Sequence, residues 1–110
     1  MSDLDTHFAA LTDPTRRAII ARLARGDATV SQLVDQFELT QPTISSHLKY
    51  LERAGFVVRD RIAQTRPCRL NPAGLKAVAD WLKDYERFWS GTLDRFVEHA
   101  DRRAETEKDG

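Results

Sequence analysis

The segment from Thr40 to Gly55 carries the side chains whose types and spacing say most about chemistry. On a helical wheel of about 100° per residue, Ile44, Leu48 and Leu51 fall on one side. The opposite side and its flanks carry mostly small polar and charged side chains: Gln41, Pro42, Thr43, Ser45, Ser46, His47, Lys49 and Tyr50. Short donors and acceptors reach the edges of base pairs in a DNA major groove without steric bulk. The pattern therefore predicts a helix that packs by one face and reads DNA with the other.

The charged residues are unevenly distributed, although the 110 residues have a formal net charge of zero. Residues 1–40 and residues 71–110 each have a net charge of −2, whereas residues 41–70 have a net charge of +4. Local potential, more than total charge, attracts a polyanion to a surface. The positive segment contains the polar helix, which supports a DNA partner.

Catalytic groups are poorly represented in the sequence. None of the four serines that could act as nucleophiles has the strand–turn–helix context of a nucleophile elbow; they are Ser31, Ser45, Ser46 and Ser90. The three histidines, His7, His47 and His99, occur singly. His47 follows two serines, but adjacent side chains of one helix point apart. We therefore predict no enzyme activity, no catalytic residue and no cofactor.

A metal site or a redox-active thiol is the sharper alternative. Asp94, Glu98 and His99 could supply ligands near the end of the last helix, but a solvated helix end explains them as well, and we predict no metal site. Cys68 could be a redox sensor if Arg66 and Arg69 lowered the pKa of its thiol. Because a second cysteine is absent, we favour a structural role for it.

Four short helices are predicted before residue 55. Leu4, Phe8 and Leu11 recur at helical spacing. The next helix is capped by Asp13, begins at Pro14 and ends at Gly26, with Ala18, Ile19, Ile20 and Leu23 facing inward. Thr29 caps a helix through Phe37 whose apolar stripe is Val30, Leu33, Val34 and Phe37. After Glu38 and Leu39, Thr40 caps the polar helix, which runs to about Ala54. A helix, a short turn and a helix with a polar outer face form a helix-turn-helix.

A short β-hairpin is predicted directly after the polar helix. Residues 56–62 alternate with period two, residues 63–66 can form a turn, and Pro67 opens a return strand through residue 70. Such a hairpin is a wing whose cations can contact phosphates or a minor groove; they are Arg59, Arg61 and Arg66. Within the polar helix, Gln41, Thr43, Ser45 and Ser46 are candidates for contacts at or near bases, with Pro42 beside them. His47 and Lys49 could contact phosphate or base, although His47 could instead close the core.

The final helix is predicted to begin at Asn71 and Pro72 and to extend to about Ala100. Its apolar surface is wider than one core contact needs, because Trp81, Tyr85 and Phe88 lie beside the main stripe. A small domain rarely leaves such a patch in water. We therefore predict a dimer surface there, formed by Trp81, Leu82, Tyr85, Trp89, Leu93 and Phe96. The alternative is that the helix wraps its own domain.

Size and composition indicate one domain over residues 1–100, followed by a charged and frayed tail over residues 101–110. The chain opens with an acidic polar segment, and no apolar run is long enough to span a membrane. The single cysteine agrees with a reducing compartment. We expect a cytoplasmic protein with no membrane partner.

Several sequence segments, taken together over about residues 5–98, resemble the ArsR-type family of winged helix-turn-helix repressors. These segments are residues 11–17 with Ile20 and Leu23, residues 33–37, residues 41–48 through Leu51, and residues 54–57. The resemblance implies a mainly α fold with a small wing and a homodimer built from the first and last helices, which would place Leu4 and Phe8 in the interface. It also implies an inverted-repeat operator of double-stranded DNA and repression by blocking polymerase.

Many members of that family release DNA when a metal or metalloid binds. A family site with a Cys-Val-Cys segment corresponds here to Thr29, Val30 and Ser31, and a second site with Asp-x-His in the last helix has no counterpart in residues 72–100. The chain thus resembles the branch without metal-sensing cysteines, and the effector is unknown. Two alternatives stay open: a metal- or thiol-responsive sensor with an atypical site, and a winged-helix module that binds proteins.

Overall fold

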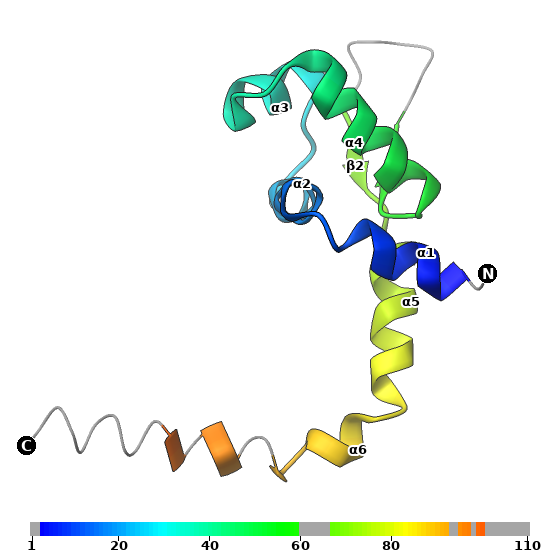
Figure 1. Cartoon of the computed structure of the whole chain (residues 1–110), viewed down its shortest axis with the longest axis vertical. Helices are drawn as coiled ribbons and strands as arrows, with labels where there is room; N and C mark the ends of the chain where they lie inside the picture. Colours follow the sequence, from blue (N-terminus) through cyan, green and yellow to red (C-terminus); the bar gives the residue numbers. More distant parts are fainter. Residues whose placement is uncertain (1–2, 60–66, 93–94, 98, 101–110) are drawn as a thin grey trace, which may run out of the picture. The chain divides into compact units, whose positions relative to one another are not determined.

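The structure is a computed structural model, and it describes residues 3–59, 67–92, 95–97 and 99–100 (Figure 1). The chain divides into two compact units, Met1–Val78 and Ala79–Gly110, which are described separately. The predicted Arg61, Arg66, Leu93, Asp94 and Glu98 lie outside the described residues, as does the tail.

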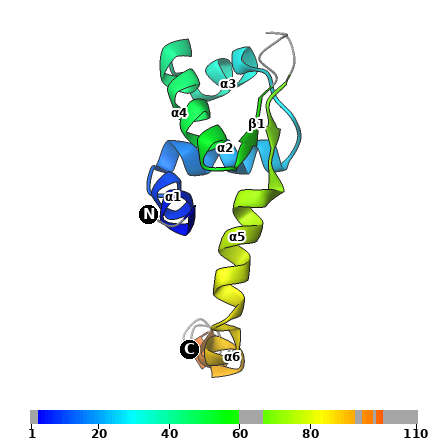
Figure 2. The same ribbon diagram turned by 90° about the vertical axis from the view of Figure 1, so that its right-hand side faces the viewer.

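Most of the described chain is helical, with one small antiparallel sheet (Figures 1 and 2). The elements are α1 (Asp3–Ala10), α2 (Pro14–Ala24), α3 (Val30–Phe37), α4 (Gln41–Arg53), β1 (Val57–Val58), β2 (Arg69–Leu70), α5 (Pro72–Lys83) and α6 (Glu86–Trp89). The predicted class, mainly α with a small β-hairpin, and the predicted order through the start of α5 are confirmed.

Side-chain caps begin the helices where the sequence predicts them. Asp13 accepts a hydrogen bond from the Arg16 N–H at 3.0 Å, and Pro14 follows as the first residue of α2. Thr29 and Gln32 form a reciprocal capping box at α3, with distances of 3.1 and 2.8 Å. Thr40 accepts from the Thr43 N–H at 3.3 Å. Each cap satisfies backbone donors that a helix start leaves free.

Left-handed residues end α3 and follow the C-cap of α4. Glu38 ends α3 at φ 55°, an uncommon conformation for a residue with a side chain, and so forms the tight turn of the helix-turn-helix. Gly55 follows α4 at φ 81°, where glycine carries no steric cost. The Gly55 N–H donates to the Glu52 carbonyl at 3.1 Å, and the Phe56 N–H donates to the Leu51 carbonyl at 2.9 Å. This pair of bonds is a Schellman motif, and it turns the chain from α4 into β1.

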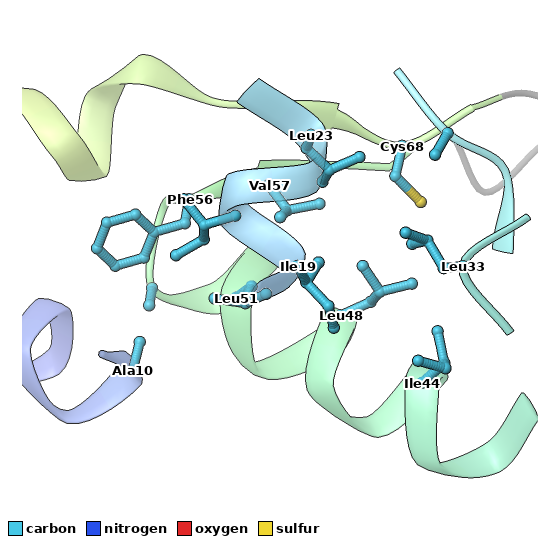
Figure 3. Close-up of a cluster of buried hydrophobic side chains, with 13 residues drawn as sticks. Ala10, Ile19, Leu23, Leu33, Ile44, Leu48, Leu51, Phe56, Val57 and Cys68 are labelled. Carbon is cyan, nitrogen blue, oxygen red and sulfur yellow. The ribbon is translucent and has the colours of Figure 1, made fainter. Parts of the chain in front are cut away.

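One apolar cluster joins α1, α2, α3, α4 and the strands (Figure 3). Its fully buried large members are Ile19, Leu33, Ile44, Leu48, Leu51, Phe56 and Val57. The predicted inner faces of α3 and α4 are confirmed. In α2, Ile19, Ile20 and Leu23 are buried as predicted, but Ala18 is exposed, so its predicted inward position is wrong. A small side chain gives a weak signal for which face of a helix is buried.

The wing is fixed to the rest of unit 1 at its base. Val57 pairs with Leu70 and Val58 with Arg69 in an antiparallel register. A backbone bridge also joins Cys68 to Ala28, through hydrogen bonds of 2.7 and 3.2 Å. The loop between α2 and α3 therefore lies against the return strand, which the sequence did not predict.

The predicted single helix to about Ala100 is wrong. Helix α5 ends at Lys83, and a turn through Tyr85 precedes the four-residue α6. Ser90 then adopts an extended conformation, and Gly91 has φ 80° before helical residues resume. The apolar spacing continues across both interruptions, so periodicity alone could not reveal them. Neither Ser90 nor Gly91 favours a helix interior, and these two residues are the local signal for the second interruption.

The first turn of α5 approaches the end of α4 closely at Gly74. Asn71 caps α5 by accepting from the Ala73 N–H at 3.0 Å, and the Gly74 N–H donates to the Gly55 carbonyl at 2.9 Å. A Cβ at residue 74 would lie 2.7 Å from a ring carbon of Phe56 and 2.9 Å from the Gly55 oxygen. Only glycine permits this approach without displacing a buried ring or the backbone.

Gly74→Ala should therefore destabilise the protein. Helix propensity alone would favour alanine by about 1 kcal/mol, but overpacking against Phe56 costs about 1–3 kcal/mol. We expect a net loss of about 1 kcal/mol in the free energy of unfolding, measured in urea. Ala73→Gly, at the neighbouring exposed position, isolates the propensity effect. A Gly74→Ala variant more stable than the wild type would show that the close approach is dispensable.

Candidate nucleic-acid interface

Helix α4 presents a continuous polar face to solvent. Its exposed residues include Gln41, Pro42, Thr43, Ser46 and Lys49, and the flanking Ser45 and His47 are half-buried. Arg53, in the last turn, is exposed as well. The predicted division of the helix into an apolar face and a polar face is confirmed residue by residue. These side chains project from one rigid element, as base-edge reading requires.

Two of the predicted reading residues already have neighbours within unit 1. The hydroxyl oxygens of Thr43 and Thr40 lie 2.8 Å apart, so the Thr43 hydroxyl belongs to the cap of α4. The pKa of the Asp13 carboxyl is lowered, first by the hydrogen bond from the Arg16 backbone and to a smaller extent by its electrostatic interaction with His47. His47 therefore lies close enough to the start of α2 to interact with the Asp13 carboxylate.

The described part of the wing contributes Arg59 at its outer end. Arg59 is half-buried and follows the exposed Val58. Strict alternation would place Phe56 and Val58 on one face of the strand and Val57 and Arg59 on the other. The structure instead buries both Phe56 and Val57, and Val58 is 37% exposed. The two consecutive buried residues follow from the turn of the Schellman motif into the strand. Exposed Arg69, on β2, adds a further cation that we did not predict as a contact.

Arg16 is a structural residue at the edge of this interface that sequence reasoning missed. Its guanidinium carbon lies 4.0 Å from the centroid of the Tyr50 ring on α4. The same group donates to the carbonyls of Ala10 at 2.8 Å and Ala9 at 3.1 Å, at the end of α1. Arg17 donates to the Leu11 carbonyl at 2.7 Å. The available signal was the pair of arginines in the first turn of α2, where a positive charge is unfavourable for the helix dipole.

Apolar residues are exposed at the positions predicted to form a dimer. In unit 1, Phe8 is exposed and Leu4 is half-buried. In unit 2, Trp81, Leu82, Tyr85 and Phe96 are exposed and Trp89 is half-buried. The rings of Trp81 and Tyr85 lie 5.1 Å apart between centroids. Phe88, which was not in the predicted set, is the most exposed aromatic residue described, at 83%.

Cys68 is a core residue. It is 2% exposed, and its sulfur points into the apolar cluster on the side of Leu33 (Figure 3). Burial raises the pKa of its thiol, while the charge of Arg59 opposes the shift. The idea that neighbouring arginines lower this pKa is therefore wrong in its net direction, because desolvation is the larger effect. A thiol in this state is a poor nucleophile.

Two further properties concern only the described residues. Among residues 3–59, 67–92, 95–97 and 99–100, no three His, Cys, Asp or Glu side chains converge as a metal site requires. Within that same part of the chain, no helix combines the length and the apolar character needed to cross a membrane.

The fold and the polar face of α4 define a winged helix-turn-helix DNA-binding protein. Residues 13–58 match the model of the arsR family of bacterial regulatory proteins. The HTH-type transcriptional regulator Rv2034 of Mycobacterium tuberculosis is 40% identical over 98 residues, which cover 88% of each chain. The chain therefore belongs to the ArsR family of bacterial transcriptional regulators.

Other similarities agree with this membership. The transcriptional repressor SdpR of Bacillus subtilis is 33% identical over 78 residues, covering 71% of this chain and 87% of SdpR. The crystal structure of the ArsR family transcriptional regulator RHA00566 has a TM-score of 0.71 and 36% identity, covering 81% of this chain and 92% of the other. The homodimeric winged helix-turn-helix domain of Mb0332 from Mycobacterium bovis shares the fold, with a TM-score of 0.61, 23% identity and coverage of 80% and 83%. The family consists of DNA-binding regulators, which are not enzymes.

The burial of Cys68 predicts slow reaction of its thiol. We expect iodoacetamide at pH 8 to alkylate the folded protein about tenfold or more slowly than the urea-unfolded chain, because reaction requires local opening. Folding raises the pKa of the Cys68 thiol above its ordinary value of 9.0. The resulting contribution to the free energy of unfolding is therefore fully present at pH values below 9.0, where the thiol is neutral in both states. This contribution is lost as the pH rises above 9.0, and a Cys68→Ala variant lacks it. Equal alkylation rates in the two states would contradict the buried position.

Proposed function

We propose that the chain is a homodimeric repressor that binds an inverted-repeat operator through α4 and the wing. The observation that carries this proposal is the exposed polar face of α4, fixed outward by its buried apolar face, within the segment of net charge +4. Two recognition helices related by a dimer axis should read half-sites about 10 bp apart, or a multiple of that spacing. Repression follows if the bound dimer blocks polymerase, and the similarity to SdpR, which is named a repressor, supports it.

Individual roles follow from position and chemistry. Gln41, Ser45 and Ser46 contact bases or groups near them, with Thr43 and Pro42 shaping the first turn of α4. Lys49 and His47 contact phosphate or base. The wing cations Arg59, Arg61 and Arg66 contact phosphates or an adjacent minor groove, and such contacts position a protein on DNA.

The dimer surface is the apolar set on the first and last helical segments: Leu4, Phe8, Trp81, Leu82, Tyr85, Trp89, Leu93 and Phe96. Exposed aromatic residues in such number favour association, because burying each large side chain contributes about 1.5–3 kcal/mol. The homodimeric state named for Mb0332 supports this assignment.

Regulation by the family's metal sites is not part of this proposal. Thr29 and Ser31 occupy the positions of the family's thiol ligands, and a hydroxyl is not a useful ligand for a soft metal. We propose a cytoplasmic repressor without a metal cofactor, with residues 101–110 as a charged tail. Calorimetry with zinc and cadmium tests this point, and binding of either metal would overturn it.

The function is tested by selecting bound sequences from random duplex DNA and titrating the winner with salt. A preferred palindromic sequence is the expected result. The absence of any sequence preference at low ionic strength would reject the assignment of α4 as a reading helix.

Arg59→Ala should weaken binding to all duplexes. Losing one phosphate contact should reduce the slope of log affinity against log salt by about one unit. Ser46→Ala or Gln41→Ala should instead weaken binding to the selected operator by about 1 kcal/mol and leave random DNA nearly unaffected. Fluorescence anisotropy over a series of salt concentrations measures both effects. An unchanged slope for Arg59→Ala would remove the wing from the interface, and equal losses on both duplexes would remove Ser46 or Gln41 from base reading.

Replacing Trp81 and Trp89 together with alanine should produce monomers. Tryptophan has the largest apolar side chain, and removing two of them sacrifices several kcal/mol of burial. Sedimentation velocity at micromolar concentration measures the change, with Arg87→Ala, an exposed polar change on α6, as the control that should stay dimeric. An intact dimer in the double variant would place the interface elsewhere.

A further inference from the structure

Arg16 connects the end of α1 to the outer face of α4. Its Nε–H donates to the Ala10 carbonyl and its Nη2–H to the Ala9 carbonyl, at 2.8 and 3.1 Å. Both acceptors belong to the last turn of α1, where carbonyls have no partner within the helix. The face of the same guanidinium covers the Tyr50 ring at 4.0 Å from its centroid. One planar group thus makes edge contacts with α1 and a face contact with α4.

Tyr50 lies among the residues that read DNA in the proposed function. Residues three and four positions apart are neighbours on a helix surface, so Tyr50 adjoins Ser46 and His47 on one side and Arg53 on the other. Helical side chains lean toward the N-terminus of the helix, which directs the ring toward Ser46 and His47. Tyr50 is 37% exposed. The position of its ring therefore affects the surface that a DNA groove would meet.

The Tyr50 ring lies on the side of α4 that faces α1. In both ribbon views, α1 lies near the C-terminal end of α4 (Figures 1 and 2). A hollow of about 190 Å³, lined by Thr6, Tyr50 and Arg53, opens beside the ring. Next to this hollow, the Arg16 guanidinium of α2 contacts both the last turn of α1 and the Tyr50 ring.

We propose that Arg16 is a positioning residue for DNA recognition, holding Tyr50 and the neighbouring readout face of α4 at a fixed distance from the end of α1. The proposal rests on α4 being the DNA-reading helix. A lysine in this place keeps the charge but cannot donate two parallel hydrogen bonds while stacking on a ring. Because α1 carries Leu4 and Phe8 of the proposed dimer surface, the Arg16 contact also links dimer formation to the reading helix.

The test compares binding to the selected operator and to a random duplex of equal length. Arg16→Lys and Tyr50→Leu should each weaken operator binding about five- to tenfold, the size expected for a partly desolvated cation–π contact. Binding to the random duplex should stay within about twofold of the wild type, and the slope of log affinity against log salt should not change, because no phosphate contact is lost. The double variant should bind the operator no more weakly than either single variant, because both changes break one contact.

Two matched variants separate positioning from other roles. Arg17→Lys changes the neighbouring arginine, which donates to the Leu11 carbonyl and has no described contact with Tyr50, and should bind within about twofold of the wild type. Tyr50→Phe keeps the ring and should also bind normally. A tenfold loss in Tyr50→Phe would assign the hydroxyl to a DNA contact and reject the role of the ring. Thermal unfolding of each variant confirms that binding is measured on folded protein, and Tyr50→Leu, at a partly exposed site, covers the case in which Arg16→Lys does not fold.

The outcomes distinguish this proposal from the function on which it rests. Multiplying losses in the double variant, or equal losses on both duplexes, would reject the positioning role while leaving DNA reading intact. A wild-type protein with no preference for any duplex would reject the function itself, and the positioning role with it.

Discussion

The burial of one face of α4 is the constraint on which the rest of the site depends. Ile44, Leu48 and Leu51 are fully buried, and each contributes about 1.5–3 kcal/mol relative to an exposed position. A rotation that moved these residues into solvent would also bury the charged and polar side chains opposite, which is costly without partners. The outward direction of Gln41, Ser46 and Lys49 is thus enforced by the core. The Thr40 cap and the Schellman motif at Gly55 fix the two ends of the helix, so its register along the core is set as well.

The same core holds the base of the wing. Cys68 contributes a small apolar side chain to the cluster, and its backbone pairs with Ala28 in the loop before α3. Where the strands join α4 and α5, the Asn71 N–H donates to the Phe56 carbonyl at 2.8 Å. Backbone hydrogen bonds therefore flank the strands on both sides and hold them in place, although each strand is only two residues long. Arg59 therefore starts from a rigid base beside α4, and its charge adds to the local field that attracts a polyanion.

Local signals account for what the sequence predicted well. Asp13, Thr29 and Thr40 act within one helical turn, and the apolar spacing of α4 depends only on the helix period, so these features need no knowledge of the fold. The bridge from Ala28 to Cys68 and the stacking of Arg16 on Tyr50 join residues that are distant in sequence, and no local pattern encodes them. The prediction of one uninterrupted last helix failed for a different reason. Apolar spacing continued through Tyr85 and Ser90, and it outweighed the weaker signal of a serine followed by glycine.

The interruptions also change how the apolar surface of unit 2 is understood. A single straight helix would place its aromatic residues on one stripe of fixed width. With turns at Tyr85 and at Ser90–Gly91, α6 is a separate four-residue segment, and Phe88 on it is 83% exposed. A short helix gains little from its own hydrogen bonds, so its conformation depends on what it packs against. The exposed rings and the short helix thus both agree with the proposed dimer surface in this part of the chain. A second copy of the chain is the partner that the proposed dimer supplies, because a two-fold axis covers the same apolar patch on both subunits at once.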